Sequence, residues 1–242
     1  MEALRLAGLE PASVFGYFEK LCTMPHGSGN TRIISDYLVS FAKEQNIPYI
    51  QDELNNVILF GPASEGYEDH EPVIIQGHMD MVCEKDPECP INFETDGLDI
   101  THDGNYVFAK GTTLGGDDGI AVAYALALLA DKSIPHPALE VVITVDEETG
   151  MYGAAGIDLS QLRGKKLIPH AFKTGILIGA TLQLIAAIPN ADILEYCAQE
   201  TVLSKNLVKH HFQLDKDGYV TIPDLPGIGV ELNMDVLNKY RR

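Results

Sequence analysis

The chain has 242 residues, of which 45% are hydrophobic, and a formal net charge of −18 at pH 7. The length and composition are those of a globular protein that can bury a core of its own, and the negative charge argues against nucleic acids and anionic membranes as partners. We expect a cytoplasmic protein, because no apolar run reaches membrane-spanning length and the N-terminus has no basic region followed by an apolar core.

The charge is unevenly distributed along the chain. Up to Ile168 there are 27 acidic and 10 basic residues, and from Pro169 onward there are 8 and 7. We therefore predict two parts, residues 1–168 and 169–242, that differ in origin. The four cysteines form no CxxC pair, which is typical of reduced thiols.

The N-terminal segment predicts helices and then a strand pair. Apolar residues at helical spacing predict two helices between Pro11 and Asn46, separated by a break at Pro25–Gly29. We expect these helices to cover one face of a sheet. His26, beside the break, could contact a ligand, but we favour an exposed loop residue. Tyr49–Gln51 and Asn56–Phe60 predict paired strands.

The next apolar run, Val73–Gly77, predicts a buried strand that ends in His78 and Asp80. Alternate residues of an extended chain point the same way, so one of these two side chains could bind a metal while the other orients it. A simple His–Asp hydrogen bond is the alternative interpretation. The polar stretch Asp86–His102 that follows is long for a connection, and we expect it to form part of an active-site wall.

A glycine-rich loop, Lys110–Gly119, leads into a predicted helix at Ile120–Asp131. Asp117 or Asp118 could cap this helix, which would explain one aspartate but not both. A phosphate site is excluded because two carboxylates would repel the anion and no GK[ST] sequence follows.

The run Ala138–Val145 predicts a second buried strand, which ends in Asp146, Glu147 and Glu148. Such a charge run is usually solvent-exposed, but after a buried strand we favour a cation that neutralises some of the acids. Carboxylates with one imidazole suit zinc, manganese or cobalt, and a hydrolytic site favours zinc. With two ions, one adjacent glutamate could bind metal while the other accepts a proton from water.

Three motifs resemble the co-catalytic zinc aminoacyl-histidine dipeptidases, which are relatives of peptidase T and carboxypeptidase G. They are GHMDMV, KGTTLGGDDGIAVAYALALLAD and LEVVITVDEETGMYGA, and the resemblance runs from about Pro11 to Ile168. It implies an α/β fold with a mainly parallel sheet flanked by helices, a cis peptide bond between Asp117 and Asp118, and hydrolysis of dipeptides.

The same resemblance implies a role for each residue of the site. His78 would bind one zinc ion, Asp117 would bridge two, and Glu148 would bind the other. Asp80 would orient His78 by a hydrogen bond, and Glu147 would be the general base and acid. The implied substrate is a small peptide. We expect a monomer, because dimer contacts in this family commonly lie in a lid domain that has no counterpart in this sequence.

Beyond Ile168 the resemblance ends. The family continues to an aspartate ligand, a lid domain and a late histidine ligand, whereas here Pro169-His170-Ala171-Phe172 follows. We therefore expect impaired activity, and His170 is the candidate replacement for the missing aspartate.

Residues from about Pro169 to Arg242 resemble instead the C-terminal end of a mandelate-racemase-type enolase-superfamily barrel, so the chain looks like a hybrid of two partial enzymes. In that family the positions of His170 and Glu195 can carry a base and an acid. The alternative functions are thus a lyase or isomerase acting on sugar acids, or a non-catalytic metal-binding hybrid. We predict a βαβ unit from Lys165 to Tyr196, which could extend the first sheet, and a β-like tail.

Overall fold

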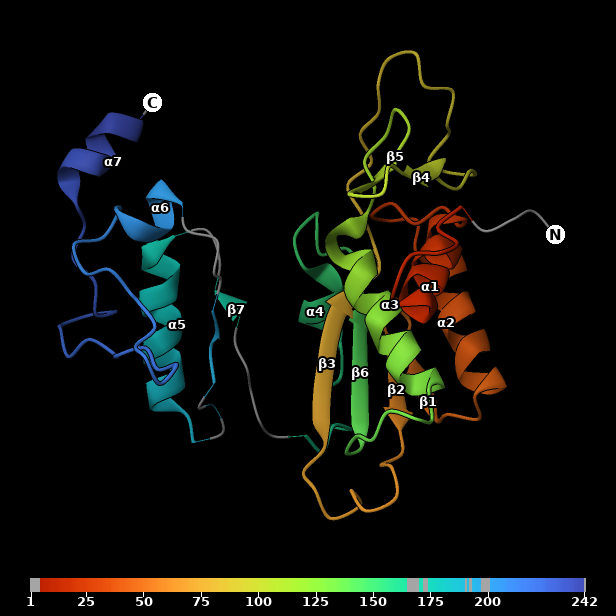
Figure 1. Ribbon diagram of the computed structural model, residues 1–242, viewed down its shortest axis with the longest axis horizontal. Helices are drawn as coiled ribbons and strands as arrows, with labels where there is room; N and C mark the ends of the chain where they lie inside the picture. Colours follow the sequence, from red (N-terminus) through yellow and green to blue (C-terminus); the bar gives the residue numbers. More distant parts are fainter. Residues whose placement is uncertain are drawn as a thin grey trace. The chain divides into compact units, whose positions relative to one another are not determined.

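The computed structural model describes residues 5–164, 170–171, 174–189, 191, 193–196 and 201–241. The chain divides into two compact units, Met1–Gly164 and Lys165–Arg242, and each is described by itself (Figure 1). None of the described helices is both long enough and apolar enough to cross a bilayer. Lys165–Pro169, where the sequence predicts the start of a strand, lies outside the described residues.

The first unit is built on a four-stranded sheet in the order β1 (Tyr49–Gln51), β2 (Val57–Gly61), β6 (Leu139–Thr144) and β3 (Val73–His78). The expected α/β class is confirmed, but the sheet is less parallel than predicted. Only β3 and β6 run parallel in it, whereas β1–β2 and β2–β6 are antiparallel. A tight turn joins β1 to β2, and so short a connection permits only antiparallel pairing.

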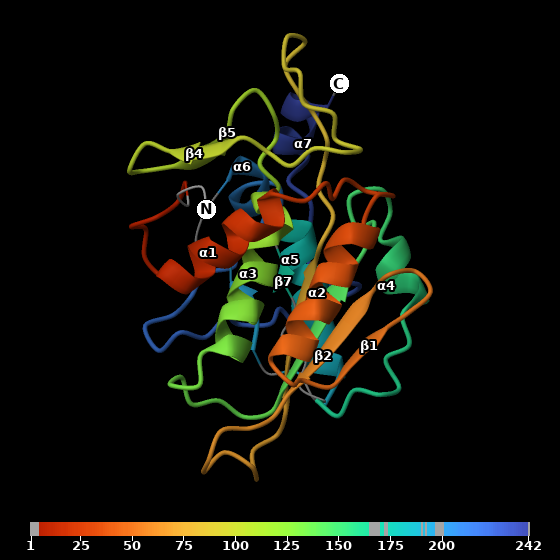
Figure 2. The ribbon, with the colours of Figure 1, turned by 90° about the vertical axis from the view of Figure 1, so that its right-hand side faces the viewer.

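Three helices cover one face of this sheet, the two predicted to do so and a third (Figure 2). They are α1 (Ala12–Cys22), α2 (Arg32–Glu44) and α3 (Gly116–Ala130). Helix α1 packs on α3, α3 packs on β3, and α2 packs on β1 and β2. The predicted spacing is confirmed, because Phe18 of α1 and Leu38 of α2 belong to the buried core.

Smaller elements surround the sheet. Strands β4 (Ile100–His102) and β5 (Val107–Ala109) form an antiparallel pair, and the short helix α4 covers Tyr152–Gly156.

Glu140, the second residue of β6, is a fully buried carboxylate. Its oxygens accept hydrogen bonds from the backbone N–H groups of Arg163, at 2.9 and 3.0 Å, and Gly164, at 2.8 Å, and from Arg163 Nε at 3.0 Å. A Cβ atom on Gly164 would lie only 2.9 Å from the side chain of Ile74 and 3.0 Å from the carbonyl oxygen of Pro72. The end of the first unit is therefore fixed against its own sheet.

Replacing Glu140 by alanine should lower the free energy of unfolding by about 2 kcal/mol, because the two backbone N–H groups lose their acceptor. Glu140→Gln keeps one acceptor oxygen and should lose about half as much. Urea denaturation followed by circular dichroism measures both variants. Equal losses in the two variants would contradict a role for these hydrogen bonds.

The second unit contains the predicted βαβ arrangement. Strands β7 (His170–Ala171) and β8 (Glu195–Tyr196) are parallel, and α5 (Gly175–Ala187) connects them. The Thr174 side chain caps α5 by accepting a hydrogen bond from the N–H of Leu177. The buried apolar residues of this unit form a small core of Ile178, Leu182, Val208 and Phe212. The unit also contains the helices α6 (Val202–Lys205) and α7 (Met234–Tyr240).

Strands β7 and β8 form a two-stranded sheet, and the extension of the first sheet by this unit stays a prediction. One expectation for this unit differs from the structure. The β-like tail predicted between Tyr219 and Val230 contains no strand. Prolines in this stretch cannot donate ladder hydrogen bonds, and Gly227 and Gly229 have φ values of 72° and 74°, which are incompatible with an extended strand.

Candidate metal centre

The candidate site lies where the parallel strands β3 and β6 end together. The last pair in their register is His78 and Thr144, so the residues that follow each strand emerge at the same edge of the sheet. The acidic run from Asp146 to Glu148 thereby comes next to His78 and Asp80. This is the convergence that the sequence predicts.

Asp80 connects the two strand ends. Its side chain accepts hydrogen bonds from the Ser28 hydroxyl at 2.7 Å and from the backbone N–H groups of Glu147 and Glu148 at 3.1 and 3.4 Å. The residue is only 1% exposed. Burial alone would raise the pKa of this carboxyl, but the hydrogen bonds from His78, Ser28 and the Glu147 N–H outweigh it and lower the pKa to about 2. Asp80 is therefore ionised, and it holds both His78 and the acidic loop, as we call the loop that contains Asp146, Glu147 and Glu148.

The two ring nitrogens of His78 face different groups. Nδ1 lies 3.0 Å from the backbone oxygen of Asp80 and 3.4 Å from its carboxylate. Nε2 lies 3.2 Å from Asp117 Oδ1 and 3.8 Å from Glu147 Oε2. Burial would lower the pKa of the imidazole, but Asp80 above all raises it to about 9. One nitrogen is thus held by Asp80 while the other points at carboxylates.

Several carboxylates lie close together around Nε2 of His78. One donor atom each from His78, Glu147 and Glu148 lie within 4.8 Å of one another. The pKa of Glu148 is raised, first by burial and then by Asp117 and the neighbouring Glu147, against the opposing effect of His78. The Asp117 side chain is 88% exposed and faces His78 from the start of α3. An imidazole and several carboxylates in this space form a donor set that suits zinc, manganese or cobalt.

The two adjacent aspartates have separate environments. The backbone N–H groups of His78 and Ala121 interact with the Asp118 carboxylate and act to lower its pKa. The capping role predicted for Asp117 or Asp118 was wrong, because the N-cap residue of α3 is Gly115 and no side chain caps the helix. Burial, together with the charge of Asp117, raises the pKa of Asp118 to about 6. The peptide bond between Asp117 and Asp118 is cis, as the family resemblance implies. Asp117 is left to face His78.

The structure thus brings together all five residues predicted for the site: His78, Asp80, Asp117, Glu147 and Glu148. Glu147, predicted as the base, lies as close to His78 and Glu148 as a metal ligand would. In the second unit, His170 and Glu195 are Cα partners in the β7–β8 register. The side chain of His170 lies outside what the structure describes, so its role as a substitute ligand stays a prediction.

The loop between α1 and α2 contributes residues that the sequence analysis missed. Ser28 donates to Asp80, and the N–H of Gly29 donates to Asp146 Oδ1 at 2.6 Å. His26 was predicted to be exposed, and this was wrong, because it is only 4% exposed. Its Nδ1 donates to the Met24 oxygen at 2.7 Å, its own backbone oxygen accepts from the N–H of Met81, and burial lowers its pKa.

The buried side-chain amide of Asn56 forms hydrogen bonds with the chain on both sides of the acidic loop. Asn56 donates to the Gly153 oxygen at 3.1 Å and accepts from the Val145 N–H at 3.0 Å. These bonds hold both ends of the loop that carries Glu147 and Glu148. The sequence did not predict this role of Asn56, which the sequence analysis named only as the first residue of a predicted strand.

Comparisons with known proteins support two separate similarities. The cytosol non-specific dipeptidase of Escherichia coli (strain K12) is 39% identical over 163 residues, which are 67% of this chain and 34% of that protein. The crystal structure of the aminoacylhistidine dipeptidase from Vibrio alginolyticus matches with a TM-score of 0.66 and 38% identity, covering 70% of this chain and 34% of that chain.

The other similarity is to a different class of enzyme. A family model for the enolase C-terminal domain-like fold matches residues 154–236. The D-galactarolactone cycloisomerase of Agrobacterium fabrum (strain C58) is 33% identical over 91 residues, which are 34% of this chain and 24% of that protein.

Both resemblances drawn from the sequence are therefore confirmed. Over two thirds of its length the chain is homologous to dipeptidases, and its C-terminal part matches the enolase-like model. The chain spans about one third of the length of these dipeptidases and one quarter of the cycloisomerase. The two partial matches are consistent with a hybrid.

Proposed function

We propose that the first unit binds zinc and hydrolyses dipeptides, with activity reduced by the absence of part of the relatives' machinery. One observation carries the proposal: His78 presents Nε2 to Asp117 and Glu147 while Asp80 holds its Nδ1 side. A histidine that binds a metal usually donates its other ring N–H to a carboxylate or a backbone carbonyl, and Asp80 offers both to Nδ1 of His78. Homology to dipeptidases supports the choice of peptide hydrolysis.

Each residue has a distinct role in this proposal. His78, Asp117 and Glu148 would hold the metal, with manganese or cobalt as the alternatives to zinc. When bound, the metal would polarise the peptide carbonyl and lower the pKa of a water molecule. Glu147 takes the proton of that water and returns it to the leaving amine. Asp80 fixes the imidazole and, through two backbone N–H groups, the position of both glutamates.

The proposed impairment follows from the sequence after Ile168. The aspartate and histidine ligands that the resemblance implies have no counterparts there, and neither has the lid. His170 is the candidate for one missing ligand. We further propose that small peptides in the cytoplasm are the substrates and that the chain is a monomer.

A second candidate function belongs to the C-terminal part. The register of β7 and β8 pairs His170 with Glu195, the positions that can carry a base and an acid in the enolase superfamily. The magnesium-binding carboxylates of such enzymes come from strands that this sequence does not contain. Racemase, lyase or isomerase chemistry on sugar acids would therefore need a second chain, and magnesium-dependent proton exchange in a hydroxy acid would reveal it.

Metal content tests the proposed function directly. Elemental analysis of the protein purified without added metal should find bound zinc, up to two ions per chain, and Asp117→Ala should lose most of it. Chelation should lower the melting temperature, because the metal stabilises the folded state and relieves repulsion among the acids. Asp117 is exposed, so the variant should keep the fold. Absence of bound metal together with an unchanged melting temperature in chelator would overturn the proposal.

A further inference from the structure

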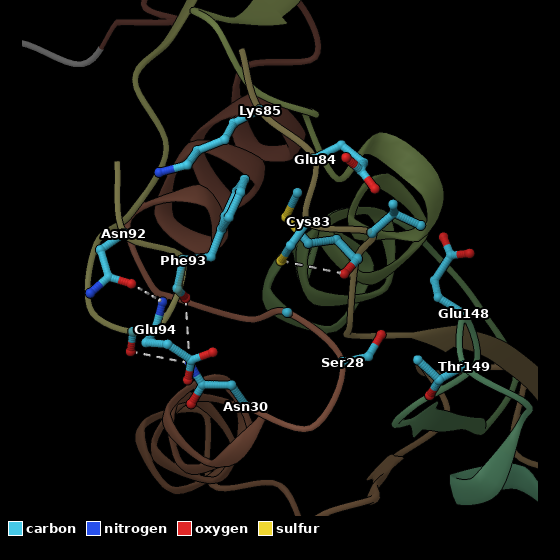
Figure 3. Close-up of a pocket in the computed structure, with 13 residues that line it drawn as sticks. Ser28, Asn30, Cys83, Glu84, Lys85, Asn92, Phe93, Glu94, Glu148 and Thr149 are labelled. Atoms are coloured by element: carbon cyan, nitrogen blue, oxygen red, sulfur yellow. Dashed lines mark hydrogen bonds between the residues drawn. The ribbon is translucent and has the colours of Figure 1, made fainter. Parts of the chain in front are cut away.

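A hollow of about 520 Å³ opens beside the candidate metal centre (Figure 3). It is formed by four segments of the first unit: the α1–α2 loop, the residues that follow β3, the loop around Phe93, and Glu148 with Thr149 after β6. On one side lie Ser28, Glu148 and Thr149, and on the other lie Lys85, Phe93 and their neighbours (Figure 3). The hollow therefore begins at a proposed metal ligand and extends away from it.

Hydrogen bonds within the chain hold the far wall in place. Asn30 Nδ2 donates to the Glu94 backbone oxygen at 3.2 Å, which ties this wall to the α1–α2 loop. Lys85 Nζ donates to the Ile91 oxygen at 2.6 Å, and the N–H of Asn92 donates to Asp96 at 2.9 Å. The wall is thus built by its own contacts, and the hollow exists before anything binds.

The lining combines apolar surface with negative charge. Met81, Val82 and Phe93 supply apolar surface, whereas Glu84 and Glu94 carry charge on two different segments. Cys83 lies between the walls (Figure 3). Burial raises the pKa of its thiol, and the charges of Glu94, Asp80 and Glu84 raise it further. The negative potential of both walls therefore reaches the middle of the hollow.

Lys85 is the cation of this lining, and its ammonium group is engaged with a backbone oxygen. A substrate carboxylate placed here would meet Glu84 and Glu94, so the carboxyl-terminal end of a peptide is disfavoured. A long side chain that ends in a cation fits better, because its methylene groups can cover Phe93 and Val82 while its charge faces the carboxylates.

We propose that this hollow is the specificity pocket for the amino-terminal residue of the dipeptide and that Glu84 and Glu94 select lysine or arginine there. The proposal rests on the hydrolytic function proposed above, because the pocket adjoins Glu148. It adds a substrate class, basic amino-terminal residues, to that function.

Binding of two amino-acid amides to the full chain tests the pocket without requiring turnover. L-lysinamide and L-norleucinamide share the α-ammonium group and a side chain of four carbons, and lysinamide carries an additional terminal ammonium group. In NMR titrations at low ionic strength, lysinamide should bind about threefold to fivefold more tightly, an effect of the size expected for a partly exposed ion pair. The preference should shrink as salt is added.

Variants assign the preference to the pocket. Glu94→Gln should reduce the lysinamide preference by about threefold and leave norleucinamide binding unchanged. Glu88→Gln is the matched control, because Glu88 is an exposed acid on the same loop outside the lining. A melting temperature for each variant verifies its fold. Equal binding of the two amides, or equal effects of the two substitutions, would overturn the proposal.

The two proposals fail separately. A lysinamide preference that depends on Glu94, in a chain that binds no metal, supports the pocket and refutes the hydrolytic function. Cleavage of dipeptides at equal rates for lysine and norleucine at the amino terminus supports the function and refutes the pocket.

Discussion

Glu147→Gln should lower kcat/KM for dipeptide cleavage by about 10²–10⁴-fold while the protein keeps its metal. The amide has nearly the same shape as the carboxylate but cannot take a proton from water. Glu147 is suited to this work because its carboxylate is 42% exposed and lies 3.8 Å from His78 Nε2, at the edge of the site where water can reach it.

The adjacent glutamate is the matched comparison. Glu148→Gln should lose bound metal together with activity, because Glu148 is proposed as a ligand. Donor atoms of both glutamates lie within 4.8 Å of the His78 donor atom, so the geometry allows the opposite assignment. Metal analysis of the two variants separates the assignments even where turnover is slow. If Glu147→Gln loses metal and Glu148→Gln retains it, the two roles are reversed.

Asp80→Ala should have the second large effect, because it removes the carboxylate that accepts from Ser28 and from the backbone of Glu147 and Glu148 and that lies 3.4 Å from His78 Nδ1. The backbone oxygen of Asp80, 3.0 Å from the same nitrogen, remains in the variant. We expect a loss of about 3 kcal/mol in the free energy of unfolding, since several buried donors lose their partner at once. Metal affinity should also fall by about 10–100-fold, the usual effect of removing a carboxylate that orients a histidine ligand.

Ser28→Ala separates the two parts of this effect. It removes one hydrogen bond to Asp80 and leaves the carboxylate, so we expect a loss of about 1 kcal/mol with metal affinity almost unchanged. Urea denaturation of the metal-free protein and a metal titration measure the two quantities. A loss of stability in Asp80→Ala with unchanged metal affinity would show that Asp80 is structural only.

The ends of strands were the informative part of the sequence. Apolar runs that stop at His78 and at Asp146 indicate where two buried strands deliver polar groups, and parallel pairing places such ends at one edge. The helices of the first unit were equally predictable, because burial of one face imposes a regular spacing on residues such as Phe18 and Leu38.

Other features depended on contacts between distant segments and left little local signal. The burial of His26 arises because the chain after β3 pairs with the loop after α1, through the bridge between Gly27 and Met81. The part that Asp80 plays in holding Glu147 and Glu148 depends on the same juxtaposition. A pattern within one segment cannot report hydrogen bonds that cross from one segment to another.

The hydrogen bonds between Glu140 and the backbone of Arg163 and Gly164 have a consequence for how such a chain could arise. They close the first unit with contacts that it makes entirely by itself, so the residues after Gly164 are not needed to keep that end in place. We therefore expect that a recombination event just after Gly164 would leave the fold upstream of it intact, because Glu140 keeps its hydrogen bonds to Arg163 and Gly164 whatever sequence follows.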